Sequence, residues 1–137
     1  MGKLHDLIKN IRFAMLTTQG TEGMLHSCPM TVQEVVDGSD LWFFIRRSSA
    51  GALDIGRNPR VNVSLAEPQD QKYVSVSGSA QLTENPPKAK ELWSPLYKTW
   101  FPKGLEDPEL ALLHVSIDRA DYWDVPKGTM IQLQELI

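Results

Sequence analysis

The sequence predicts a mainly β protein (β with helical insertions) in which six to seven short antiparallel strands form a barrel. Apolar segments of strand length are separated by nine Gly and nine Pro, which is typical of many strands and turns. Apolar and polar residues alternate over 61–65 and again over 73–77, as expected for strands with one buried face. Helical spacing occurs in too few places for parallel β–α–β crossovers. An antiparallel barrel is the simplest solution, because closure removes exposed sheet edges.

Length and composition indicate a single domain over residues 1–137. Hydrophobic residues make up 42% of the chain and charged residues 23%, as in globular proteins with a buried core. The net charge of −3 argues against a general nucleic-acid binder. No apolar run approaches the roughly 20 residues of a membrane span, and the first residues lack a secretory pattern. With Cys28 as the only cysteine, we expect a cytoplasmic protein without an internal disulfide.

The first half of the chain contains one predicted helix and three predicted strands. Apolar residues at helical spacing predict an amphipathic helix over 3–11, which leads into a strand at 14–18. The cluster at 19–23 predicts a hairpin turn before a second strand over about 25–35. Residues 41–45 are apolar at every position, which favours a central strand that is buried on both faces.

A short helix over 50–55 follows, and it ends before Asn58-Pro59 because proline disfavours helix at the preceding residue. The alternating segments 61–65 and 73–77 predict neighbouring antiparallel strands. Gly78 interrupts the second of these, where a barrel wall needs a bulge or a close backbone approach.

The second half predicts a helical insertion over about 86–113. Asn85 is the expected N-cap, and Pro95 divides or kinks the insertion. Asp107-Pro108 repeats this N-cap and proline signal and predicts a last helical segment over 109–113. Two final strands are expected around 114–117 and 122–125.

General catalytic and metal-binding motifs are absent from the sequence. His5, His26 and His114 lie far apart without a metal-ligand neighbour at short spacing, so no metal site is expected and no catalytic residue is assigned. On a strand, His26 and Cys28 point to the same face. The pair is either a thiol with an adjacent base, or a packed wall cysteine beside a hydrogen-bonded histidine.

Two further features have both a structural and a functional interpretation. The segment 46–49, Arg-Arg-Ser-Ser, opens a helix, where free N–H groups favour an anion such as phosphate; the alternative is a serine cap with two solvated arginines. Trp93, Tyr97, Trp100 and Phe101 are concentrated in one segment, which suits either core packing or contact with a planar ligand or a partner chain.

Seven segments in this order resemble a known family. They are AMLTT at 14–18, SCPM at 27–30, LWFFI at 41–45, NPRVNV at 58–63, YVSVSGSA at 73–80, WFPKG at 100–104 with DP at 107–108, and DYWD at 121–124. Together they resemble the general stress protein 26 group of pyridoxamine 5′-phosphate oxidase-like, FMN-binding split β-barrel proteins. The resemblance spans nearly the whole chain and implies a split β-barrel of the FMN-binding type.

The resemblance also implies a homodimer with two interface flavin sites, with FMN as the cofactor and FAD as the second choice. The residues implied beside the isoalloxazine ring and ribityl chain are His26, Ser27, Cys28, Pro29, Met30 and Thr31. Those implied at the phosphate end are Phe44, Ile45, Ser48, Ser49 and Gly51, while Trp100 and Phe101 are expected to approach from the partner chain.

The sequence departs from the family at three of these positions. Cys28 stands where an arginine is expected, Ile45 where threonine is common, and Gly51 where a phosphate-binding lysine is expected. Arg46 or Arg47 could compensate, but neighbouring residues on a strand alternate in direction, so at most one should face the site.

Two functions fit the residues. The first is a flavin-binding stress protein, extending to an FMN-dependent oxidoreductase of unknown substrate, in which the cofactor carries the chemistry. The second is a cofactor-free dimeric binding module that has lost its phosphate contacts. A deazaflavin or haem is a further candidate ligand for the same groove. Pyridoxamine 5′-phosphate oxidase activity is not expected, because residues 130–136 carry no Arg or His for a substrate phosphate.

Overall fold

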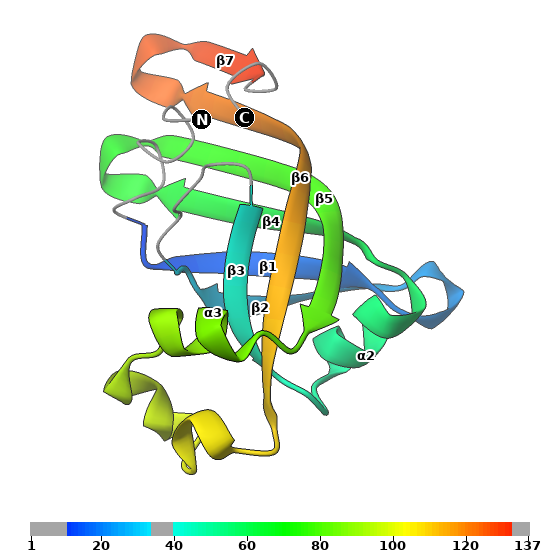
Figure 1. Ribbon diagram of the computed structural model, residues 1–137. Helices are drawn as coiled ribbons and strands as arrows, with labels where there is room; N and C mark the ends of the chain where they lie inside the picture. Colours follow the sequence, from blue (N-terminus) through cyan, green and yellow to red (C-terminus); the bar gives the residue numbers. More distant parts are fainter. Residues whose placement is uncertain (1–10, 34–39, 133–137) are drawn as a thin grey trace.

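A computed structural model describes residues 11–33 and 40–132 (Figure 1). The predicted helix over 3–11 lies outside these residues except for Ile11, which belongs to no helix. No helix in the described part of the chain is long and apolar enough to cross a membrane.

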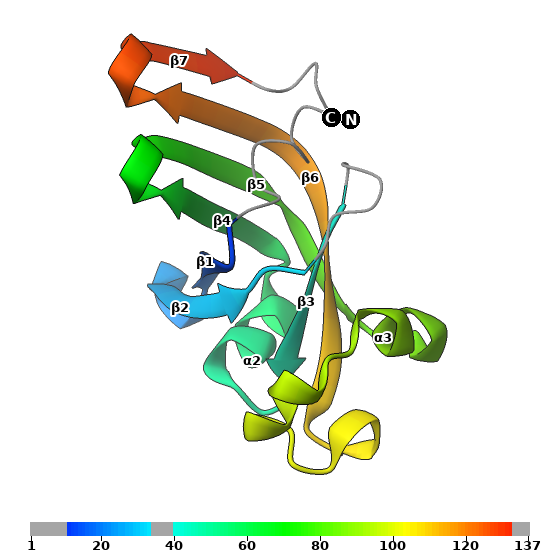
Figure 2. The same ribbon diagram turned by 90° about the vertical axis from the view of Figure 1, so that its left-hand side faces the viewer.

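Seven strands form one curled half-barrel sheet in which every pairing is antiparallel (Figures 1 and 2). The strands are β1 (Phe13–Gln19), β2 (Leu25–Thr31), β3 (Asp40–Arg46), β4 (Arg60–Glu67), β5 (Lys72–Thr83), β6 (Leu110–Asp124) and β7 (Thr129–Gln132). Their order is β2-β1-β4-β5-β6-β3, and β7 also pairs with β6. The mainly β, antiparallel split-barrel prediction is confirmed.

The core lies along the inner face of this sheet. Leu16, Phe43, Val63, Val76 and Leu113 come from five different strands, and each is fully buried. On β1, β3, β4 and β5 buried residues alternate with more exposed ones, whereas residues 110–113 of β6 are all buried. Helix α2 (Ala50–Arg57) packs against β1, β2 and β5 and adds its own buried residues to this core.

Strand β3 is not the central strand that its apolar sequence predicts. It lies at one end of the strand order and pairs with β6 within the described residues. Phe43 faces the core, whereas Phe44 points outward, where the rings of Trp93 and Tyr97 cover it at 5.8 and 5.5 Å between centroids. The strand is apolar on both faces because a segment of the insertion covers its outer face.

The insertion begins as predicted and ends earlier. Asn85 caps α3 (Pro86–Leu92) by accepting from the Lys88 N–H at 3.2 Å, and Pro95 opens a separate 3₁₀ turn. The 3₁₀ turns are η1 (Thr21–Gly23), η2 (Pro68–Asp70), η3 (Pro95–Thr99), η4 (Gly104–Glu106) and η5 (Val125–Lys127).

The predicted helical segment over 109–113 is not observed. The prediction of two separate strands around 114–117 and 122–125 is also wrong. Residues 110–124 form the single strand β6, which runs between β5 and β3 (Figure 1). A short apolar run cannot distinguish strand from buried helix, and pairing of Ala111 with Ile45 decides for strand here.

Gly78 marks the predicted bulge, since the β5–β6 register shifts between Ser77 and Gly78. A Cβ at this position would lie 2.0 Å from the Ser116 carbonyl oxygen. The close backbone approach requires glycine.

Candidate functional site

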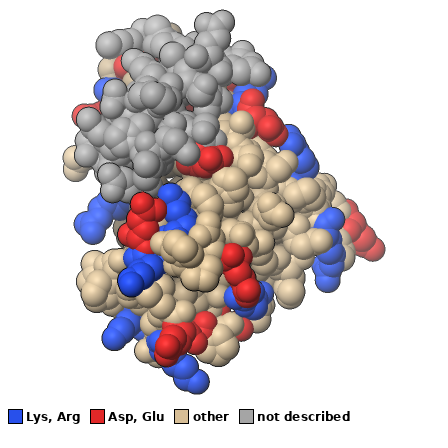
Figure 3. Space-filling model, in the orientation of Figure 1, with Lys and Arg blue, Asp and Glu red and all other residues tan. Residues whose placement is uncertain are grey.

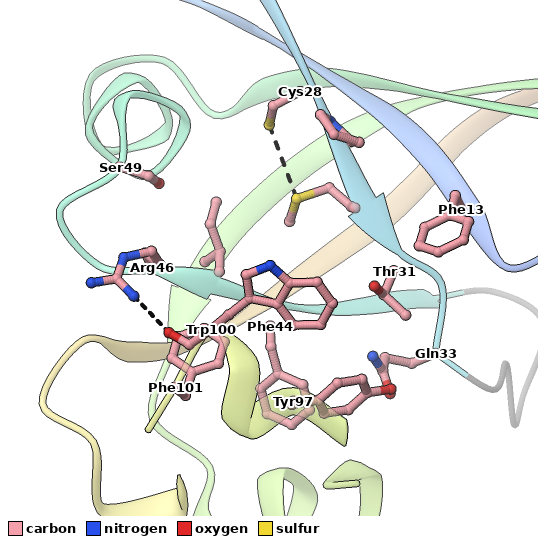
Figure 4. A pocket seen from close by; sticks show the side chains of 13 residues that line it. Phe13, Cys28, Thr31, Gln33, Phe44, Arg46, Ser49, Tyr97, Trp100 and Phe101 are labelled. Carbon is pink, nitrogen blue, oxygen red and sulfur yellow. Dashed lines mark hydrogen bonds between the residues drawn. The ribbon is translucent and has the colours of Figure 1, made fainter. Parts of the chain in front are cut away.

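A pocket of about 320 Å³ lies between the end of β2, the end of β3 and the segment that follows η3 (Figure 4). Its lining consists of Phe13, Cys28, Pro29, Met30, Thr31, Gln33, Phe44, Ile45, Arg46, Ser49, Tyr97, Trp100 and Phe101. Aromatic and aliphatic side chains dominate this list. Apolar walls with a few polar groups are typical of small-molecule sites.

Most residues that the resemblance placed at a flavin site meet in this pocket. Those brought together are Cys28, Pro29, Met30, Thr31, Phe44, Ile45, Arg46, Ser49, Trp100 and Phe101. Those that do not line it are His26, Ser27, Arg47, Ser48 and Gly51. Their role in binding remains a prediction.

Trp100 and Phe101 line the pocket of their own chain. The resemblance had implied that they reach the site from the partner chain. Phe101 is only 4% exposed, so it packs within this chain, while Trp100 remains half exposed. Helix α3 ends at Leu92, Pro95 opens η3, and the chain then returns toward β3. There Arg46 Nη1 donates to the Trp100 carbonyl oxygen at 2.6 Å (Figure 4).

Three lining residues were absent from the predicted site. Tyr97 belongs to the aromatic cluster, which was the available signal, and its hydroxyl donates to Gln33 Oε1 at 3.1 Å. Gln33 is 7% exposed, and no sequence pattern marks it. Phe13 lies on the outer face of β1 and reaches the pocket from its rim.

Arg46 and Arg47 point to different places, as strand alternation requires. Arg46 lines the pocket, and its Nη2 lies 3.8 Å from Glu109 Oε1. Arg47 Nη2 donates to the Leu110 carbonyl oxygen at 2.8 Å and lies 3.5 Å from Glu84 Oε1. Of these two arginines, Arg46 is the one that lines the pocket.

The two serines make local hydrogen bonds. Ser49 Oγ accepts from the Ala52 N–H at 3.2 Å and so caps α2, although Ser49 also lines the pocket. Ser48 Oγ donates to the Glu109 carboxylate. The capping interpretation of Ser49 is therefore confirmed.

The whole chain, residues 1–137, matches the sequence profile of the family described as "Pyridoxamine 5'-phosphate oxidase like". The chain belongs to this pyridoxamine 5′-phosphate oxidase-like family. It is 25% identical over 133 residues to Protein bli-3 of Neurospora crassa, an alignment that covers 88% of this chain and 64% of that protein. The chain thus spans less than two-thirds of that relative's length.

Two solved structures are similar in both sequence and fold. General stress protein 26 from Bacillus anthracis str. Sterne is 26% identical, with a TM-score of 0.80 and coverage of 96% of this chain and 97% of that chain. The general stress FMN/FAD binding protein from Xanthomonas citri is 33% identical, with a TM-score of 0.76 and coverage of 88% and 85%.

The three departures from the pattern expected for this oxidase-like family lie together in space. A Cβ built on Gly51 would lie 3.7 Å from Ile45 Cδ1 and 3.9 Å from Cys28 Sγ. The Cys28 Sγ is itself 4.0 Å from Met30 Sδ (Figure 4). One end of the pocket is therefore lined by Ile45, the Cys28 thiol and the Met30 thioether, with the buried Gly51 beside them.

The Cys28–His26 pairing is not an activated nucleophile in this structure. Burial raises the pKa of the Cys28 thiol, which keeps it protonated near neutral pH. The His26 Nδ1–H donates instead to Asp54 Oδ2 at 2.9 Å, and the Thr18 hydroxyl donates to the same oxygen at 2.9 Å. These contacts lower the pKa of Asp54, His26 more than Thr18, and they tie α2 to β1 and β2.

Asp124 is also buried, and its Oδ2 accepts from the Tyr122 hydroxyl at 3.2 Å. Lys and Arg side chains are interspersed with Asp and Glu side chains on the face that Figure 3 shows. His114 stacks on Trp42 with 4.3 Å between ring centroids, and its Nε2 lies 2.9 Å from Asp40 Oδ1. The part of the chain that the structure describes contains no group of three or more His, Cys, Asp or Glu side chains able to hold a metal ion.

Proposed function

We propose that this chain binds a flavin in the pocket between β2, β3 and the segment after η3. One observation carries the proposal: residues from β2, Phe44 and Trp100, far apart in sequence, line a single cavity of about 320 Å³. The cavity lies near the lower end of the range of roughly 300–1,000 Å³ for small-molecule sites.

The surroundings suit a flat heterocycle. Phe44, Tyr97 and Trp100 offer aromatic surface on which a ring can pack. Strand β2 stands at one end of the strand order, and alternate residues of such a strand direct backbone N–H and C=O groups away from their neighbour. These groups can hydrogen-bond the polar edge of an isoalloxazine ring.

Family membership and the 33% identical Xanthomonas citri protein, described as FMN/FAD binding, support the same ligand class. A bound flavin would supply redox chemistry. The residues of this chain would bind it, orient it and exclude water, with Phe101 and Met30 as buried support and Trp100 as cover.

We include a homodimer in the proposal. Phe13 and Met15 are 62% and 42% exposed on the outer face of β1, and Phe13 also lines the pocket. Tyr73 and Trp123 are register partners on the same outer side of the sheet, and both are exposed. A second copy over this apolar face would bury it and enclose the pocket rim, because exposed apolar patches mark association surfaces.

The test is an absorption spectrum of freshly purified protein, followed by titration of apoprotein into riboflavin, FMN and FAD while flavin fluorescence is recorded. Flavin absorbance, or saturable quenching, supports the proposal. Colourless protein that leaves the fluorescence of all three flavins unchanged at micromolar concentration contradicts it and favours the cofactor-free binding module. Sedimentation equilibrium of wild type and Phe13→Glu tests the dimer, which the variant should weaken.

A further inference from the structure

We propose that the pocket recognises the ring system of the flavin and not its phosphate, so that riboflavin binds as tightly as FMN. This inference rests on the proposed function and narrows its ligand class. Three observations carry it: the contacts of Arg46, the uncharged side chains of Cys28 and Ile45 at one end of the pocket, and the hydrogen bond from the Ser48 hydroxyl to Glu109.

Arg46 is the one charged residue that lines the pocket within the described residues. Its Nη1 already donates to the Trp100 carbonyl oxygen at 2.6 Å, and its Nη2 lies 3.8 Å from Glu109 Oε1. The Glu109 carboxylate offsets the charge of the guanidinium. A phosphate monoester, with a charge of about −1.5 to −2 near pH 7, would meet this carboxylate as well as the cation.

The end of the pocket lined by Cys28 and Ile45, beside the buried Gly51, offers no cation in addition to Arg46. A Cβ built on Gly51 would lie within van der Waals contact of both Ile45 and Cys28, and the three side chains are a protonated thiol, an alkyl group and a hydrogen atom. Arg47 does not replace a missing cation, because its guanidinium is bound to the Leu110 carbonyl oxygen and faces Glu84. An anion placed here would lose its water without gaining a charged partner.

Of the hydroxyl groups beside this end, that of Ser48 is engaged as a donor, because its Oγ donates to the Glu109 carboxylate. Ser49 Oγ accepts from the Ala52 N–H and so caps α2. A phosphate that used the Ser48 hydroxyl would have to displace it from Glu109. The ring, in contrast, requires the aromatic wall and the edge of β2 that pairs with no strand in the described part of the chain.

The test compares dissociation constants for riboflavin and FMN, measured by fluorescence quenching in one buffer at one ionic strength. We expect the two constants to agree within about threefold. FMN binding more than about tenfold tighter than riboflavin would overturn this inference while leaving the proposed function standing. If neither ligand binds at micromolar concentration, the proposed function fails, and this inference fails with it.

A charge-removing variant sharpens the test. Glu109→Gln keeps an oxygen for the Ser48 hydroxyl and removes the negative charge near Arg46. We expect FMN to bind about three- to tenfold more tightly to this variant, with riboflavin binding unchanged. Glu84→Gln is the matched control, because Glu84 faces Arg47 outside the pocket, and it should change neither constant. An unchanged FMN-to-riboflavin ratio in Glu109→Gln would overturn the argument that Glu109 offsets the charge of Arg46 toward a phosphate.

Discussion

Arg46 Nη1 donates to the Trp100 carbonyl oxygen at 2.6 Å, which ties the end of β3 to the segment that covers the pocket. The bond joins residues that are 54 positions apart in the chain. It holds an exposed tryptophan over the proposed ring site without using the tryptophan side chain. Arg46 therefore positions Trp100 over the pocket, a role that Arg47 does not share.

Replacing each arginine by alanine should have unequal effects. Arg46→Ala removes the tie to Trp100, and we expect riboflavin and FMN to bind about three- to tenfold more weakly, by the same factor. Arg47→Ala should leave both dissociation constants unchanged, because its contacts with Leu110 and Glu84 lie outside the pocket. Isothermal titration of both variants checks this. If neither variant changes the dissociation constants, Arg46 does not contribute to the site. If Arg46→Ala weakens FMN binding but not riboflavin binding, Arg46 binds the phosphate.

Introducing a cation at position 51 should create phosphate selectivity. A side chain at Gly51 would begin at ordinary contact distance from Ile45 and Cys28, so a lysine can enter without a backbone clash. Gly51→Lys should tighten FMN about tenfold or more relative to riboflavin, because it adds a charge-assisted hydrogen bond. Gly51→Met controls for side-chain length and should not change the ratio. An unchanged ratio in the lysine variant would show that phosphate does not reach this end.

The β5–β6 bulge should tolerate no side chain at Gly78. Gly78→Ala places a Cβ 2.0 Å from the Ser116 carbonyl oxygen, and the strands must separate locally to accommodate it. We expect the free energy of unfolding to fall by about 1–3 kcal/mol, as for other overpacked sites. Gly56→Ala is the control: it has open space around it on α2 and should raise stability by up to about 1 kcal/mol. Urea denaturation of both variants measures the difference, and equal curves would disprove the clash.

The Asp54 contacts predict a loss of stability in acid. Hydrogen bonds from His26 and Thr18 hold the pKa of Asp54 below its ordinary value. The ionised carboxylate therefore stabilises the fold fully above the unfolded-state pKa of about 3.9, and the contribution disappears as pH falls through the lower folded-state pKa.

Urea denaturation at a series of pH values below about 6 should show a shallower decline for Asp54→Asn than for wild type. Asp70→Asn, at an exposed position in η2, should follow the wild-type curve. Parallel curves for wild type and Asp54→Asn would contradict the role assigned to Asp54.

Cys28 offers a chemical probe of occupancy. Because burial raises the pKa of its thiol, alkylation by iodoacetamide at about pH 7.5 should be slower than that of free cysteine. Saturating riboflavin should slow it several-fold further, since Cys28 lines the pocket. The same ligand should have no effect on the protein in urea. If riboflavin does not change the alkylation rate of Cys28 in the folded protein, the flavin binds elsewhere.

Local patterns were enough to predict several elements of the fold. Alternation predicted β4 and β5 as neighbours, Gly78 predicted the bulge, and Asn85 and Pro95 predicted where α3 begins and where the helical run breaks. These features depend on the dihedral preferences and hydrogen bonds of residues near one another in the chain. The strand pattern itself predicted an antiparallel barrel, and the segments that resemble a known family added most of the pocket lining.

Long-range strand pairing decided the elements that local sequence patterns left open or predicted wrongly. The apolar run at 110–113 is compatible with helix or strand, and its partner β3, more than sixty residues earlier, makes it a strand. The same pairing moves β3 from the predicted centre to one end of the sheet order. Whether an apolar segment becomes strand or helix depends on which distant surface covers it, and that surface has no local signature.

Composition and periodicity alone predict an antiparallel β fold with a divided helical insertion, because side-chain burial repeats every second residue along a strand. Only the folded chain shows that Trp100 covers its own pocket, that Arg46 and Arg47 diverge, and that Cys28, Ile45 and Gly51 meet at one end. These three facts depend on distances between residues remote in sequence, which are set by the packing of the whole sheet.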